Sequence, residues 1–440
     1  MLTRRREAAK TGTLYPSQDN LRNPPPHFGI YYSNMRIRLL IAVCLLALPA
    51  AAQTFRVFGF LTGREIYATG QPSWTTGGFG RLDVGAHGVN DNATLNQLLA
   101  QIGADWSPAT WITFHAQGLA RHEPSGTQGK RAGLVEGYAE LHNDKWRLRA
   151  GEFFLPTSRE NIDPLWTSPY TISDSALNSW IGQEVRPLGV DLQYKPNFYL
   201  TAGATAFRGN DTMGTLLAWR GWSVGNRLSV YDEVLPLPPV FSLGKPGYFR
   251  WQRAGTIAIG PDFDGHTGWS ARVRASLPER GMIQFTRVDN RGDRELYTNQ
   301  YSWTTRFNVI SGELGSRDAT IFAAEYANGT TGMGPMDPLR AFVQLDFSTA
   351  YVLVSRKSGR FRTSARFDVF DTHDRDHSIA ETNTEHGRSW TLAAFYEPNA
   401  YTRAGAEFVQ VTGRRIAAEQ SGFDGNTDGR TLTLEVRYRF

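Results

Sequence analysis

The chain has 440 residues, of which 20% are charged and 12% are aromatic. Its formal net charge of +5 comes from the first 52 residues, which hold seven of the 47 basic and two of the 42 acidic residues and leave 40 of each. Because the remainder is balanced, net charge gives no reason to expect a nucleic acid or an acidic partner.

Residues 35–52 have the layout of a secretory signal peptide. Arg36 and Arg38 precede an apolar run at 39–48 that ends in small residues suited to a cleavage site. That run is too short to span a membrane as a helix, which takes roughly twenty residues. We therefore expect residues 53–440 to form the mature protein.

Residues 1–34 do not fit in front of a signal peptide. They carry a basic cluster at 4–6 and three consecutive prolines at 24–26. We interpret them as a non-native upstream extension, with a genuine uncleaved cytoplasmic anchor as the alternative. The sole cysteine, Cys44, lies in the apolar run, so no disulfide is expected in residues 53–440.

From residue 53 onward the chain consists of segments of about ten residues with a polarity period of two, which predicts β-strands. At the C-terminus the apolar face holds Leu432, Leu434, Val436, Tyr438 and Phe440, and the polar face holds Thr431, Thr433, Glu435, Arg437 and Arg439. A second polar face carries Arg362, Ser364, Arg366 and Asp368. Such a face suits water and its opposite suits lipid, although soluble sandwiches share the period.

Tight turns separate many of these segments, and aromatic residues such as Trp106 and Trp111 flank most of the turns. The predicted turns lie at 107–110, 143–144, 195–197, 224–225, 278–279, 316–317, 358–359 and 398–399. Amphipathic rings at strand ends are typical of a membrane interface. The turns predict an all-β, transmembrane antiparallel barrel of 16 strands, or alternatively 18, with an aqueous interior.

Two features complicate or extend this count. Residues 54–106 suggest three strands, near 56–67, 77–89 and 95–105. Because an even number of strands is expected in such a barrel, one of the three should not be a full barrel strand. Longer polar connections are predicted at 122–132, 233–267, 328–339, 371–387 and 412–429. Short turns alternating with long loops are typical of outer-membrane barrels.

The stretch Gly151-Glu152-Phe153-Phe154-Leu155-Pro156 is followed by Ser158 and Glu160 and then by a long loop at about 156–187. Here the sequence resembles Gram-negative porins of the phosphate-selective O/P type. The resemblance implies a homotrimer of 16-stranded barrels with inward-folded loops. It also implies that the barrel assembly machinery recognises the last strand through Phe440. The chain departs from phosphate specialists because only five lysines follow residue 52, so phosphate selectivity is not expected.

The residues of this loop support a pore constriction independently of the resemblance, because long loops without secondary structure are usually functional. The candidate constriction residues are Arg159, Glu160, Asp163, Asp174, Glu184 and Arg186, and the candidate loop anchors are Trp166, Tyr170 and Trp180. Opposed charges across a constriction filter solutes by charge and size. The candidate lumen-lining residues are Arg362, Arg366, Asp368, Glu435 and Arg437. The alternative is a solvated surface loop.

Enzyme-like and metal-like patterns are weak. The G-x-S-x-G match at 221–225 lacks a following helix, so we interpret it as a hairpin turn. The histidine- and carboxylate-rich loop at 371–387 and the Asp/Gly-rich stretch at 423–429 fit no standard zinc or calcium pattern. No metal, cofactor or catalytic residue is predicted.

The pattern as a whole predicts a porin in the cell outer membrane, a passive channel for small hydrophilic solutes or anions, surrounded by lipid and lipopolysaccharide. Two alternatives remain. The first is an outer-membrane barrel hydrolase, which needs only ten to twelve strands and is therefore shorter. The second is a periplasmic all-β binding protein, whose outer face would be wet.

Overall fold

The computed structural model describes residues 53–88, 91–244, 249–252, 255–277, 280–337, 340–376 and 381–440. The predicted extension (1–34), the predicted signal peptide (35–52) and the turn predicted at 278–279 lie outside these residues. Among the described helices, none is both long enough and apolar enough to cross a membrane.

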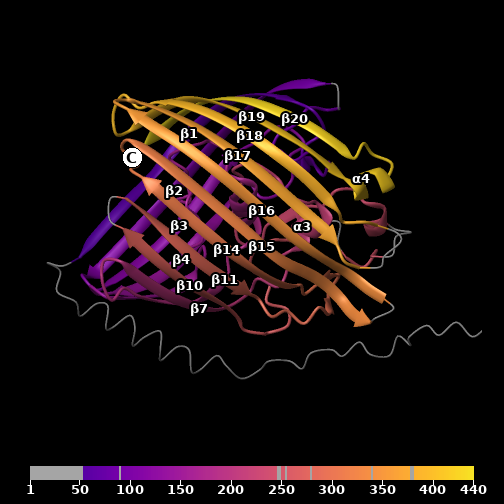
Figure 1. The fold of residues 1–440 in the computed structure, drawn as a ribbon, viewed down its shortest axis with the longest axis horizontal. Coiled ribbons are helices and arrows are strands. Elements are labelled where there is room, and N and C mark those ends of the chain that lie inside the picture. Colours follow the sequence, from indigo (N-terminus) through magenta and orange to yellow (C-terminus); the bar gives the residue numbers. More distant parts are fainter. Residues whose placement is uncertain are drawn as a thin grey trace, which may run out of the picture. The chain divides into compact units, whose positions relative to one another are not determined.

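Sixteen antiparallel strands close into a single barrel, in which neighbours in sequence are neighbours in space (Figure 1). The strands are β1 (Thr54–Thr69), β2 (Asn92–Ala109), β3 (Ile112–His122), β4 (Ala132–His142), β5 (Trp146–Glu152), β6 (Leu188–Tyr194), β7 (Leu200–Arg208), β10 (Gly268–Leu277), β11 (Gly281–Asp289), β14 (Thr304–Gly315), β15 (Thr320–Asp337), β16 (Arg340–Ser358), β17 (Phe361–Asp374), β18 (Glu385–Tyr396), β19 (Thr402–Arg415) and β20 (Asn426–Arg439). The predicted fold class is confirmed, with 16 strands rather than 18.

The first and last strands form the seam that closes the barrel. β1 pairs with β20 from Phe60 opposite Arg439 to Thr69 opposite Arg430. Gly59 and Phe440 then exchange two backbone hydrogen bonds of 3.0 Å beyond the end of this ladder. Closure gives every barrel strand a neighbour on both sides, which is the condition for a sheet to lie in hydrocarbon.

The predicted alternation of the last strand is confirmed by its side-chain exposure. Leu434 and Val436 on the outer face are 52% and 59% exposed, whereas Glu435 and Arg437 on the inner face are 2% and 4% exposed. The same pattern continues around the wall, where large apolar side chains such as Val352 point outward. The barrel therefore carries its exposed apolar side chains on the outside, as a wall in contact with lipid does, while its inner face combines buried charged residues with buried apolar ones such as Phe307 and Phe347.

Six of the eight predicted turns lie between consecutive barrel strands in the described residues. A seventh, at 278–279, falls between the bounds of β10 and β11, and these seven connections with the two strands at the seam account for all sixteen strands. The turn predicted at 224–225 is wrong, because this stretch lies inside the barrel. The strand predicted at 77–89 is also wrong, because the connection between β1 and β2 holds irregular backbone and one 3-10 helix, Trp74–Thr76. These two errors explain the ambiguity in the predicted strand number.

The longer connections all leave the barrel at the rim opposite these short connections, and α4 (Ile416–Gln420) marks this rim in Figure 1. The long connection predicted at 328–339 is wrong, because β15 continues to Asp337 and pairs with β14 through its polar residues. Asn308, for example, donates to Asn328 at 3.1 Å. Two small hairpins, β8 (Val234–Pro236) with β9 (Gly255–Ile257) and β12 (Leu296–Tyr297) with β13 (Gln300–Tyr301), belong to other connections.

The outer face can be tested with cysteines introduced at Leu434 and Val436 in a Cys44→Ser background. Because both side chains point away from the barrel, hydrocarbon should shield them, and a water-borne maleimide should label neither in intact membranes. Gln420→Cys in the exposed part of α4 is the control and should react fully. Ready labelling of Leu434→Cys would contradict the membrane-embedded barrel.

Candidate functional site

Two stretches of chain fold back into the barrel. The first inward segment, residues 153–187, connects β5 to β6, and the second inward segment, residues 209–231, follows β7. Most of their residues are buried. Two small cavities, of about 50 and 20 Å³, remain between these segments and the wall of β1, β2, β19 and β20. The smaller one has room for about one water molecule.

The first inward segment was predicted to lack secondary structure, but it contains the helix α2 (Ala176–Glu184). Ser175 caps this helix by accepting a hydrogen bond from the Asn178 backbone at 3.2 Å. A serine followed by nine residues without proline is a recognisable helix start. The helix is too short and too evenly buried to show an amphipathic period, so this signal was missed.

The three predicted anchor side chains all contact the barrel wall or the inward segments. Tyr170 packs against residues of β15 and β16, including Ile321 and Leu353. Trp180 meets Phe307 and Phe347 of the wall edge to face, and it also meets Trp222 of the second inward segment. Trp166 stacks on Phe154, with ring centres 4.0 Å apart.

Four of the six predicted constriction residues are buried rather than facing water. Glu160, Glu184 and Arg186 are fully buried, and Asp174 is 3% exposed. The side chains of Arg159 and Asp163 remain 13% and 26% exposed, and they lie near Glu313 and Arg317 of the wall. The structure thus buries four of the six side chains and leaves those of Arg159 and Asp163 partly exposed. The role of all six at the constriction stays a prediction.

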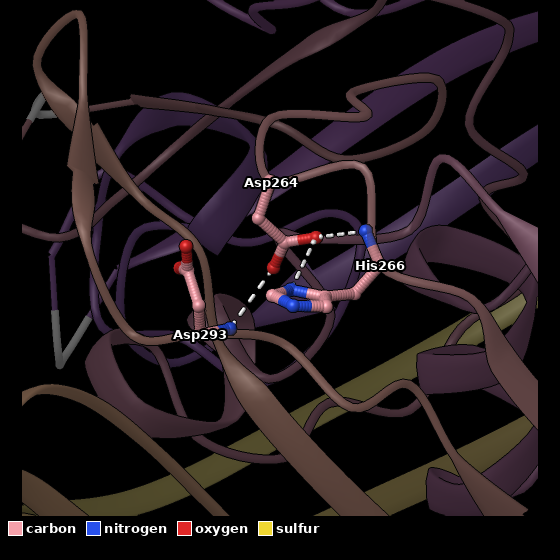
Figure 2. Close-up of side chains that lie close together, drawn as sticks. All are labelled: Asp264, His266 and Asp293. Atoms are coloured by element: carbon pink, nitrogen blue, oxygen red, sulfur yellow. Dashed lines mark hydrogen bonds and ion pairs between the residues drawn. The ribbon is translucent and has the colours of Figure 1, made fainter.

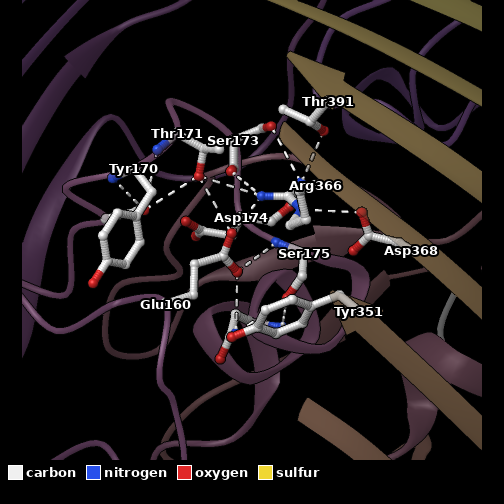
Figure 3. A network of polar contacts seen from close by, with 12 residues as sticks. Glu160, Tyr170, Thr171, Ser173, Asp174, Ser175, Tyr351, Arg366, Asp368 and Thr391 are labelled. Carbon is white, nitrogen blue, oxygen red and sulfur yellow. Dashed lines mark hydrogen bonds and ion pairs between the residues drawn. The ribbon is translucent and has the colours of Figure 1, made fainter. Parts of the chain in front are cut away.

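Arg366 and Asp368 on β17 hold the first inward segment in place (Figure 3). The Arg366 guanidinium pairs with the carboxylates of Glu160 and Asp368, and it donates to the carbonyls of Ser173 at 2.7 Å and Asp174 at 3.0 Å. Asp368 accepts from the Ala176 backbone at 3.2 Å, at the start of α2. One arginine thus fixes the turn that leads into the helix.

The other predicted lumen-lining residues, Arg362, Glu435 and Arg437, are also buried on the inner face of the barrel. Arg362 donates to Ser355 Oγ at 3.1 Å and to the Arg317 carbonyl at 3.0 Å, whereas Glu435 and Arg437 are ion-paired. Glu435 lies among three arginines, with contacts of 2.9 Å to Arg64, 2.8 Å to Arg403 and 3.4 Å to Arg437. On β19, Glu407 accepts from the backbone of Ile172 at 2.5 Å and of Ser173 at 2.8 Å. Carboxylates of the wall therefore bind the first inward segment as Arg366 does.

The second inward segment was missed by the sequence reading, which assigned 221–225 to a hairpin turn. It contains α3 (Thr215–Trp219) and two buried tryptophans, Trp219 and Trp222. The apolar run Leu216-Leu217-Ala218-Trp219 breaks the period of two and could have signalled it. Gly221 is needed here for close packing, because a Cβ atom would lie 1.7 Å from a Glu385 carboxylate oxygen.

Charged side chains hold the backbone of the second inward segment. Arg415 donates to the carbonyls of Ala218 and Trp219 at 2.6 and 2.9 Å. Asp83 accepts from the Asn226 and Arg227 backbones at 2.6 and 2.9 Å. Irregular backbone placed out of contact with bulk water needs such partners, because an unpaired N–H or C=O group is costly.

Glu184 joins the two inward segments. Its carboxylate accepts from Trp180 Nε1 at 2.7 Å and from the backbones of Gly214 and Leu216, both at 3.0 Å. Burial raises the pKa of Glu184 to about 7, and the N–H donors and the more distant charge of Arg220 offset this only in part. The contact between the two inward segments therefore contains a carboxyl that titrates near neutral pH.

A group that could hold a metal ion lies in the connections outside the barrel wall (Figure 2). Ligand atoms of Asp264, His266 and Asp293 lie within 4.8 Å of one another. Asp264 already accepts from the His266 and Asp293 backbones at 2.7 and 2.9 Å, and from Ser302 at 2.7 Å. These contacts organise the loops, and the sequence reading did not single this group out.

No family model and no curated protein matches this chain. Among solved structures, the outer-membrane channel DcaP of Acinetobacter baumannii has a TM-score of 0.56 at 11% identity, covering 89% of this chain and 99% of DcaP. OmpF of Salmonella typhi in complex with daunomycin has a TM-score of 0.52 at 10% sequence identity, and the match covers 88% of this chain and 97% of OmpF. The anion-selective porin of Comamonas acidovorans has a TM-score of 0.50 at 9% sequence identity, and the match covers 88% of this chain and 100% of that porin. The fold is that of Gram-negative outer-membrane porins.

Arg366→Gln should destabilise the folded protein by about 3 to 5 kcal/mol, because it leaves buried carboxylates without their partner. Urea unfolding in detergent micelles measures this loss. Arg306→Gln, on the exposed outer face of β14, is the matched control and should cost less than about 0.5 kcal/mol. A loss in Arg366→Gln no larger than that of the control would contradict the assigned role.

Glu184→Gln should remove part of the pH dependence of stability. The folded protein keeps the Glu184 proton up to about pH 7, whereas the unfolded chain releases it near its ordinary pKa of 4.5. The free energy of unfolding of the wild type should therefore fall by up to about 3 kcal/mol as pH rises through this window, and this contribution should be constant above it. Unfolding curves between pH 4.5 and 7.5 measure the slope.

The control for this experiment is Glu295→Gln, which changes an exposed carboxyl in a connection. In this variant the free energy of unfolding should change with pH as steeply as in the wild type. A slope in Glu184→Gln equal to that of the wild type would show that the Glu184 carboxyl does not titrate differently in the folded protein.

Proposed function

We propose that this protein is a porin of the cell outer membrane, a passive channel for small hydrophilic solutes. The observation that carries this proposal is a closed 16-stranded barrel, apolar outside and charged inside, whose lumen holds clamped chain segments. A barrel of this size has an interior wide enough for water and loops. Because two segments occupy it, the conducting path is narrow and the conductance is low.

The predicted residues take two roles in this proposal. Trp166, Tyr170 and Trp180 anchor the first inward segment, and Arg366 and Asp368 fix its turn. The charged residues predicted for the constriction act partly as clamps, and Arg159 and Asp163 border the water. Selectivity therefore depends on few exposed charges, while the buried ones set the width of the path.

The assembly partners are proposed from the resemblance to porins. We infer a homotrimer in outer-membrane lipid and lipopolysaccharide, delivered by the barrel assembly machinery that recognises the last strand. Phe440 suits such recognition because its backbone completes the seam with Gly59. A phosphate-selective O/P type of porin is a narrower assignment, and it depends on which anions the channel prefers.

Two alternatives fit less well. A barrel hydrolase needs fewer strands than the sixteen found, and Ser223 of the G-x-S-x-G match is buried, with its hydroxyl 3.5 Å from Gln183 Oε1. A periplasmic binding protein would not expose outward apolar side chains such as Leu434 and Val436.

Single-channel recording in planar bilayers tests the proposal. The wild type should conduct weakly, and replacing residues 215–230 by a short Gly-Ser linker should raise the conductance about twofold or more, because it removes most of the second inward segment. A linker in place of 416–425, the connection at the rim that contains α4, is the control and should change conductance little. No current from either the wild type or the linker variant would overturn the channel.

A further inference from the structure

Four arginines gather on one side of the lumen, toward the rim with the short turns. Arg147 lies on β5, Arg272 and Arg274 on β10, and Arg159 on the first inward segment. Strand register places Arg147 and Arg272 at one level of the wall, because Gln193 and then Gly203 lie between them. Arg147 and Arg272 both donate to Gln193 Oε1, at 3.0 and 3.3 Å.

The lack of a side chain at Gly203 makes room for this cluster. A Cβ atom there would lie 2.5 Å from the guanidinium carbon of Arg272. The arginine side chain therefore lies flat across β7 instead of being displaced toward the barrel axis. Its guanidinium binds Asp191 with two hydrogen bonds of 2.6 and 2.8 Å, so this one cation is neutralised in place.

The other three guanidiniums are not neutralised in this way. Arg274 donates twice to the neutral amide oxygen of Gln284, at 2.9 and 2.8 Å. Arg147 is 3.9 Å from Glu140 and 4.0 Å from Asp191. These carboxylates instead accept hydrogen bonds from Arg149, at 2.8 and 3.1 Å, and from Arg272.

Arg159, the third, is 3.7 Å from Glu313, and no carboxylate of the described residues lies closer to it. Arg147, Arg159 and Arg274 thus carry more positive charge than their neighbours balance.

These three side chains are also within reach of water. Arg147 is 29% exposed and Arg159 is 13% exposed, while Arg274 is partly exposed. The Nε atoms of Arg147 and Arg159 are buried donors without a hydrogen-bond partner in the described structure. A solute can reach these partly exposed guanidiniums, in contrast to the clamping Arg366, whose side chain is fully buried and whose three nitrogen atoms all have partners.

We propose that Arg147, Arg159 and Arg274 form a binding site for small oxyanions on the permeation path, so that the channel prefers anions to cations. Planar guanidiniums match the oxygen atoms of phosphates and carboxylates. Glu140 and Glu313 beside the site keep the binding weak enough for release, which a conducting site requires. This inference rests on the proposed channel function and names its solute class.

The test is the reversal potential in a KCl gradient, followed by titration with phosphate and with succinate. The wild type should favour chloride over potassium, and both oxyanions should reduce the chloride current. The triple variant Arg147→Gln, Arg159→Gln, Arg274→Gln should lose this preference, and the concentration for half-inhibition should rise roughly tenfold or more. Arg306→Gln, an outward-facing arginine of β14, is the matched control and should behave as the wild type.

The outcomes separate this inference from the proposed function. A cation-preferring or unselective wild-type current would overturn the oxyanion site while leaving the channel. If no current is found, the channel fails, and the site is judged by phosphate-dependent protection against thermal unfolding in detergent. Protection in the wild type that is lost in the triple variant supports the site, and equal midpoints with and without phosphate overturn it. Inhibition by phosphate but not by succinate would restrict the site to phosphates.

Discussion

The structure depends on one constraint, that backbone polar groups kept from bulk water must find a partner inside the protein. The barrel meets it by closing β1 onto β20, and the ends of this seam are sealed between Gly59 and Phe440. The two inward segments have mostly irregular backbone and cannot meet the constraint by themselves. Charged side chains of the wall meet it for them, as Arg366 and Arg415 do through pairs of carbonyl groups.

What the sequence could predict follows from local patterns. Alternation along 431–440 assigns each side chain to lipid or lumen, because the period of a strand is two and the two environments differ in polarity. Short turns between such strands then give the strand number. The count failed at residues 77–89, which form no barrel strand, and at 221–225, where Gly221 and Gly225 suggested a turn. These glycines instead let carboxylates of the wall and of the β1–β2 connection approach the backbone.

The candidate site was harder to predict, because its contacts join residues far apart in sequence. Glu160 and Arg366 are separated by 206 positions, and Glu435 and Arg64 by 371. A local sequence pattern cannot predict whether Glu160 pairs with Arg366 or is hydrated by water. A charged loop residue was therefore read as facing the channel, although for Glu160, Glu184 and Arg186 the charge serves to fasten one segment to another.

The abundance of arginine, with 35 arginines and five lysines after residue 52, is explained by the same constraint. A guanidinium has five donors in a plane and can hold a carboxylate and two carbonyl groups together, as Arg366 does, whereas an ammonium group has three donors and no plane. A lumen filled with folded chain therefore selects arginine for structural reasons alone. It follows that an arginine-rich interior is not in itself a sign of anion transport. Only an arginine that water can reach, such as Arg147 or Arg159, can bind a passing solute.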